Sequence, residues 1–146
     1  MNEERMEVFF HTGLSVEVSD SEFVVRFLKD SNQYNAKSVK HQAFSPRQNS
    51  KTGRWEVSVF RYRGESKEFW KERNQEISSK TTYHGFAKLN VGKIRSINLE
   101  VEADDTPPAH ANIIGWQTLE DKTLNKSLQM SLSQKLANFS EKILYS

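Results

Sequence analysis

The spacing of hydrophobic residues changes along this chain, and the changes predict its elements. Residues 22–28 are rich in β-branched and aromatic side chains, which favours a strand over the alternative of a short buried helix. Residues 55–63 alternate, with Val57 and Val59 on one side and Phe60 on the other. Apolar groups on both sides are typical of a central strand. Shorter runs predict a strand or extended segment at 38–44, strands at 83–91 and 93–101, and a short strand or buried turn at 110–116.

A helical period replaces this alternation in two places. Residues 65–77 carry apolar side chains at helical spacing, with Ser66 as the N-cap. Residues 118–145 form a longer helix, in which Thr118 and Asp121 resemble a capping box. Its apolar stripe consists of Leu124, Leu128, Leu132, Leu136, Phe139 and Ile143.

The order of these elements predicts an α+β fold. We expect a mostly antiparallel sheet, covered by the long C-terminal helix and by one shorter central helix. The length of 146 residues fits a single domain spanning 1–146. Polar residues at 45–53 predict an exposed loop, and Pro107-Pro108 predict a break after residue 103.

Composition narrows the setting and the chemistry. The chain has no cysteine, which excludes disulfides, thiolate zinc sites and a cysteine nucleophile. It has no apolar run long enough to span a membrane, and its acidic first five residues are unlike a signal peptide. We therefore expect a cytoplasmic protein. Phosphate-binding glycine loops and metal-ligand spacings are missing, so we expect no metal and no cofactor.

Charge is unevenly distributed although the net charge is only +2. Residues 34–73 carry ten Lys and Arg against four Asp and Glu, and residues 74–97 are also basic, whereas the flanking residues 1–33 and 98–108 are acidic. Such a segment is typical of a surface for phosphate-bearing partners, unless the flanks neutralise it in the fold. Aromatic residues within it would stack single-stranded bases, or else form core. The candidate binding residues are Lys40, His41, Arg61, Arg63, Asn112 and Trp116.

A catalytic alternative uses the histidines. His84 and His110 would act as acid and base, with Arg61 on a phosphate, as in metal-independent cleavage of RNA or in a toxin-like transferase. This requires three residues far apart in sequence to meet in one cleft. The structural alternative is that His84 packs against aromatic neighbours and that His110 caps a turn.

Several short pieces between residues 43 and 122 form one further pattern. They are Ala43-Phe44 with Pro46, SVFR at 58–61, HG at 84–85 with Ala87, Pro107-Pro108, HANIIGW at 110–116 and Asp121-Lys122. Their order resembles an uncharacterised family of small bacterial cytosolic proteins. That family carries proline after the tryptophan, where this chain has Gln117. The resemblance implies a bacterial cytosolic protein and brings no activity with it, but it singles out Arg61, His84, His110 and Asn112.

Three functional hypotheses follow from the sequence. The first is a small binding or accessory module that engages single-stranded nucleic acid or a partner protein. The second is the phosphoester or nucleotide enzyme built on His84, His110 and Arg61. The third is a structural subunit that assembles an oligomer through its C-terminal helix. For Asn112 and Trp116, beside Ile113-Ile114-Gly115, a structural role in a turn competes with a binding role.

Overall fold

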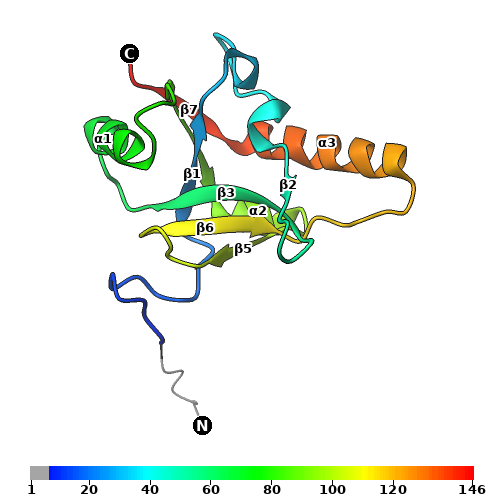
Figure 1. The fold of residues 1–146 in the computed structure, drawn as a ribbon, viewed down its shortest axis with the longest axis horizontal. Coiled ribbons are helices and arrows are strands. Elements are labelled where there is room, and N and C mark those ends of the chain that lie inside the picture. Colours follow the sequence, from blue (N-terminus) through cyan, green and yellow to red (C-terminus); the bar gives the residue numbers. More distant parts are fainter. Residues whose placement is uncertain (1–6) are drawn as a thin grey trace.

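An antiparallel sheet of seven strands forms the centre of the protein (Figure 1). The structure is a computed structural model that describes residues 7–146, so the acidic first five residues lie outside it. The strand order is β5-β6-β3-β1-β4-β7, with β2 paired to β3 beside this path. The strands are β1 (Phe23–Leu28), β2 (Arg47–Gln48), β3 (Trp55–Tyr62), β4 (Gly85–Asn90), β5 (Glu100–Ala103), β6 (His110–Ile114) and β7 (Glu141–Leu144).

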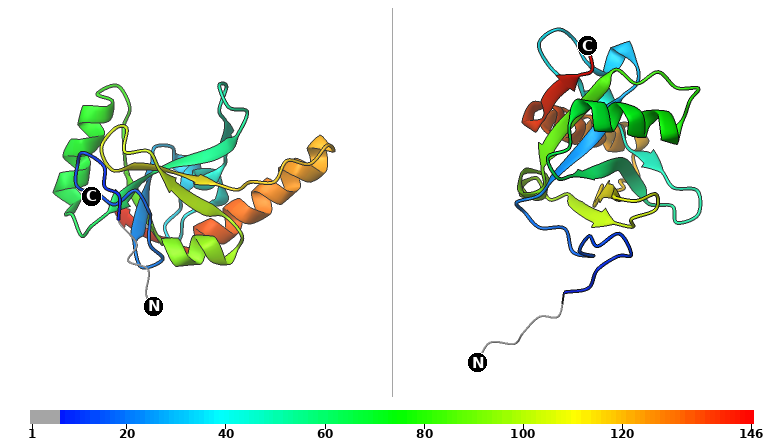
Figure 2. Two further views of the ribbon diagram at one scale, coloured as in Figure 1. Left: turned by 90° about the horizontal axis from the view of Figure 1, so that it is seen from below. Right: turned by 90° about the vertical axis from the view of Figure 1, so that its left-hand side faces the viewer.

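Helices cover both faces of this sheet, as the two views of Figure 2 show. They are α1 (Lys67–Ile77), α2 (Val91–Ser96) and α3 (Lys122–Phe139), with two 3₁₀ turns, η1 (Ser31–Gln33) and η2 (His41–Phe44). One face packs an aliphatic core with residues of α2, α3 and η2, including Ile94, Leu136 and Phe44. The other face packs an aromatic core around Trp70 of α1. The predicted α+β architecture is confirmed.

The strongest sequence patterns form the expected elements. The strands predicted at 22–28, 55–63, 83–91 and 110–116 correspond to β1, β3, β4 and β6. The central helix begins where its cap predicts, because the Phe69 amide donates to Ser66 Oγ at 3.2 Å.

The strand predicted over 93–101 is wrong in its first half. Asn90 caps a helix instead, since its Oδ1 accepts the Lys93 amide at 3.1 Å. Val91 and Ile94, three residues apart, then both point into the aliphatic core. Only the end of the segment is extended, as β5. A single helical turn and a strand both bury such residues, so hydrophobicity alone did not distinguish them.

The long helix is shorter at both ends than predicted. Asp121 is its N-cap, because its Oδ1 accepts the amides of Thr123 and Leu124 at 2.9 and 3.0 Å. The helix ends at Phe139, and residues 141–144 form β7 on the edge of β4. Ile143 therefore packs as a strand residue in the aromatic core. The first half of α3 extends away from the sheet (Figure 2), which leaves Leu124 60% exposed.

Two short segments between β1 and β3 also differ from their predicted structure. Residues 38–44 end in the 3₁₀ turn η2 rather than in a strand, although Val39 does bridge to Tyr34. The loop predicted at 45–53 contains the two residues of β2, which pair with the start of β3. The second segment matters because four of its residues line the pocket described below, and the first contributes the Ala43 carbonyl that holds Arg26 there.

Candidate functional site

Arg61 is a buried structural residue. Its side chain is 2% exposed and forms an ion pair with Glu22 at 2.8 Å. The same guanidinium donates to the carbonyl oxygens of Ser15 at 2.5 Å and Glu17 at 3.4 Å. These contacts fix the segment before β1 against β3 and leave Arg61 no room to contact a ligand. The structure therefore gives Arg61 structural contacts, in place of the exposed position expected of a binding or catalytic residue.

The two candidate histidines lie apart from Arg61 and from each other. His110 is paired with Phe60 and shares its face of the sheet. Arg61 follows Phe60 on β3, so the side chains of His110 and Arg61 point to opposite faces. The Nδ1 of His110 lies 2.8 Å from Asp104 Oδ1. His84 lies beside Leu28 at the far end of β1, and its Nδ1 is 2.6 Å from the Tyr34 hydroxyl. The expected catalytic meeting of His84, His110 and Arg61 does not occur.

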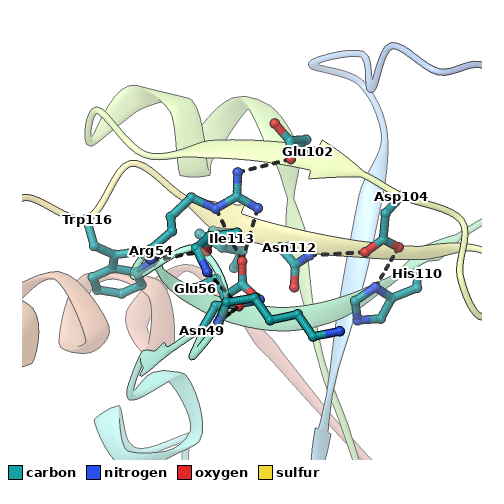
Figure 3. A network of polar contacts seen from close by, with 11 residues as sticks. Asn49, Arg54, Glu56, Glu102, Asp104, His110, Asn112, Ile113 and Trp116 are labelled. Atoms are coloured by element: carbon teal, nitrogen blue, oxygen red, sulfur yellow. Dashed lines mark hydrogen bonds and ion pairs between the residues drawn. The ribbon is translucent and has the colours of Figure 1, made fainter.

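Asn112 and Trp116 are buried residues with structural contacts. Asn112 is 6% exposed, and its Nδ2 donates to Asp104 Oδ2 at 3.4 Å, so Asp104 lies between Asn112 and His110 (Figure 3). Trp116 is 7% exposed and its Nε1 donates to the Ile113 carbonyl at 3.0 Å. Of the two sequence alternatives, the structure supports the structural one for both residues.

The remaining candidates do not form a common surface. Arg63 is exposed just beyond the end of β3, whereas Lys40 and His41 are half-buried at the start of η2. Of the aromatic residues expected to stack bases, Phe60 and Trp70 are buried in the aromatic core, Trp55 and Tyr62 are half-buried and Phe69 is 45% exposed. The two buried rings are therefore not available to stack a base.

A pocket of about 210 Å³ opens where two central strands separate. β1 and β3 pair only as far as Val25 and Phe60. Beyond this point β1 continues along β4, while β3 takes β2 as its partner, with Arg47 opposite Glu56. The gap is lined by Arg26, Lys29, Ser45, Arg47, Gln48, Asn49, Glu56, Val57 and Ser58. We call it the cationic pocket because three of its side chains are positively charged.

Arg26 is held at the inner wall of the cationic pocket by backbone oxygens alone. Its Nε donates to the Ala43 carbonyl at 2.9 Å and its Nη1 to the Ser58 carbonyl at 3.0 Å. Nη2 makes no hydrogen bond with any residue that the structure describes, and no carboxylate pairs with the guanidinium. Burial, reinforced by the charge of Arg47, lowers the pKa of Arg26 to about 10. The charge is thus fixed in place without a counter-ion.

Lys29 and Arg47 add two further cations to the pocket. Neither side chain has a hydrogen bond or ion pair within residues 7–146. Burial lowers the pKa of Lys29, and the charges of Arg26 and Arg47 lower it further, with only Asp30 acting in the opposite direction. The three cations therefore repel one another in the free protein.

The one carboxylate in the pocket is already occupied. Glu56 Oε2 accepts from Arg54 at 3.0 Å, and its Oε1 accepts from Asn49 at 3.1 Å. Arg54 also reaches Glu102 of β5 at 3.1 Å, so the β2–β3 hairpin is tied across to the sheet edge (Figure 3). Glu56 pairs with Arg54 and not with Arg47, and the lining keeps an excess of positive charge.

This arrangement is suited to an anion with several oxygen acceptors. The pattern of repelling cations, a fixed guanidinium with a free nitrogen and nearby hydroxyl and amide groups is what a phosphate or carboxylate ligand requires. The sequence analysis did not identify Arg26 and Lys29, because they lie before the segment 34–73 that is rich in Lys and Arg. The available signal was Arg26 itself, the one charge within the apolar strand FVVRFL.

The described part of the chain shows neither a metal-binding cluster nor a helix able to span a membrane. No group of three or more His, Asp or Glu residues there could hold a metal ion. None of the helices within residues 7–146 has the length and apolarity needed to cross a membrane. The chain matches no protein-family model, no curated protein and no solved structure.

Proposed function

We propose that this protein is a small bacterial cytoplasmic binding module that engages single-stranded nucleic acid through a backbone phosphate. The observation that carries the proposal is the cationic pocket, which Arg26, Lys29 and Arg47 line and in which the one carboxylate, Glu56, is paired with Arg54. Phosphate contacts supply most sequence-independent affinity for nucleic acid. A single strand is flexible enough to place a phosphate in a recess, which a rigid duplex is not.

A non-catalytic role agrees with the positions of the other candidate groups. The histidines that would act as acid and base lie at separate places, and neither lines the cationic pocket. General acid–base catalysis needs such a group within hydrogen-bond reach of the substrate. Within the pocket Glu56 is engaged by Arg54 and Asn49, and the remaining polar side chains are cations, hydroxyls and amides, which can bind phosphate.

Fluorescence anisotropy with a labelled single-stranded RNA tests this proposal. At about 50 mM salt we expect saturable binding that weakens at about 200 mM. The Lys29→Gln/Arg47→Gln variant should bind about tenfold more weakly or worse. The Lys67→Gln/Lys80→Gln variant is a matched control, because it removes the same charge from two exposed positions, the first residue of α1 and a residue beyond its end. Equal loss in both variants, or no binding by the native protein, contradicts the proposal.

A protein partner is the second candidate, favoured by one observation. The projecting half of α3 leaves Leu124 60% and Met130 46% exposed. Light scattering on the native protein and on Leu124→Lys tests self-association through this end, as a structural subunit would require. A native dimer that becomes a monomer in the variant supports this candidate, and a native monomer contradicts the structural-subunit version.

A further inference from the structure

The charge of the cationic pocket exceeds that of one internal nucleic-acid phosphate. Three cations and one carboxylate, Glu56, line it, which gives the lining a net charge of +2. A phosphodiester within a strand carries a single negative charge, whereas a phosphate monoester carries about −1.5 to −2 near neutral pH. The monoester therefore matches the pocket charge more closely.

The donors approach the pocket from two separate segments of the chain. Arg26 comes from β1, Lys29 follows that strand directly, and Arg47 comes from β2. The Arg26 guanidinium is held through Nε and Nη1, and its Nη2, which has no hydrogen bond within residues 7–146, is free to donate to a ligand. Donors arranged around a recess fit the oxygens of a chain end, whereas an internal phosphodiester needs room for the strand to leave on both sides.

The lining of the pocket also excludes a nucleobase. It contains no aromatic side chain, and Val57 is its only hydrophobic residue. Bases bound by proteins that recognise single strands stack on aromatic rings, so a base has no platform here. What the pocket offers is recognition of phosphate alone.

We infer that the cationic pocket selects the terminal phosphate monoester of a nucleic-acid strand over the phosphodiesters within it. This inference rests on the proposed function, and it names the group at which the strand is recognised. Arg26 provides the fixed donor, and Lys29 and Arg47 provide the additional charge that a monoester balances. The rest of the strand lies outside the pocket.

The test compares RNAs that differ only at their ends. An oligonucleotide of about 12 residues with an internal fluorophore is prepared with two hydroxyl ends, with a 5′-phosphate or with a 3′-phosphate. We expect at least one phosphorylated form to bind about tenfold more tightly than the hydroxyl form. The two phosphorylated arms identify which end is recognised. Inorganic phosphate at constant ionic strength should compete for the phosphorylated RNA.

Variants assign the preference to the pocket. Lys29→Gln/Arg47→Gln should remove the discrimination between ends, while the control Lys67→Gln/Lys80→Gln should retain it. If the three RNAs bind equally and the pocket variant weakens all of them, the pocket binds internal phosphates: the inference fails and the proposed function stands. If no RNA binds at low salt, both fail. A preference that persists in the pocket variant also overturns the inference.

Discussion

Two arginines on neighbouring central strands show how different environments give one side chain different uses. Arg61 of β3 lies opposite Val24 of β1, and Arg26 lies two residues further along β1. Both point to the same face of the sheet and both donate to backbone carbonyl oxygens. Only Arg61 has a carboxylate partner, Glu22 at 2.8 Å. Arg26 instead has Arg47 and Lys29 as its charged neighbours.

The difference separates a structural cation from a cation available to a ligand. A buried charge with an internal partner is satisfied, and a ligand would have to displace that partner. A charge fixed by carbonyls but surrounded by other cations has an unfavourable environment that a bound anion improves. The comparison leads us to place the site at Arg26 and not at Arg61.

The largest effect should follow removal of Arg61. Arg61→Met strands the Glu22 carboxylate and leaves the Ser15 and Glu17 carbonyls without their donor. We expect the free energy of unfolding to fall by about 3 kcal/mol in urea denaturation. Arg63→Met, at an exposed position, should change it by less than about 0.5 kcal/mol. Similar values for the two variants would contradict the structural role of Arg61.

Removal of Arg26 should cost less stability. Arg26→Met leaves the Ala43 and Ser58 carbonyls unpaired, but it also relieves an uncompensated half-buried charge. We expect a loss of about 1 kcal/mol in the same denaturation assay, together with loss of RNA binding by the folded protein. A loss as large as that of Arg61→Met would show that Arg26 is equally structural.

Salt dependence measures how many phosphates the protein neutralises. For a single strand, the logarithm of the association constant falls with the logarithm of salt concentration by about 0.7 per neutralised phosphate. Because the pocket cations surround one phosphate, the Lys29→Gln/Arg47→Gln variant should reduce this slope by about 0.7. An unchanged slope in anisotropy titrations would place the phosphate contacts elsewhere.

The smallest effect should be a gain in stability. Arg47→Gln removes a cation that lowers the pKa of Lys29 and of Arg26. A lysine whose pKa is lowered in the folded state binds protons more weakly there than when unfolded, so its charged form opposes folding at neutral pH. Removing this repulsion should raise the free energy of unfolding by a few tenths of a kcal/mol, since solvent screens the charges. The pKa of Lys29, followed by NMR, should rise; a fall would contradict the repulsion.

The sequence predicted the elements whose pattern is local. β1, β3 and α1 combine strong periodicity with a clear cap or break, so neighbouring residues decide their structure. β7 was missed because Ile143 continues the leucine stripe of α3, and only the free edge of β4 makes strand pairing available there. α2 was missed because one helical turn buries Val91 and Ile94 as well as a strand would.

The candidate site depends on pairing that no local pattern encodes. The cationic pocket exists because β1 leaves β3 after Val25 and β2 takes its place. Arg26 and Arg47 are far apart in the sequence, and Arg47 lies in a segment that reads as a loop. The sequence did indicate a basic middle segment, but it could not show that Arg61 would be neutralised by Glu22 from an acidic flank.

The most direct test of the central claim is an NMR titration of the native protein with inorganic phosphate at constant ionic strength. The account predicts saturable shifts of the Arg26 Nε–Hε signal and of amides lining the pocket, such as that of Ser58, with the Arg61 signal unchanged. Shifts that do not saturate, or that spread over exposed lysines while Arg26 stays fixed, would contradict it.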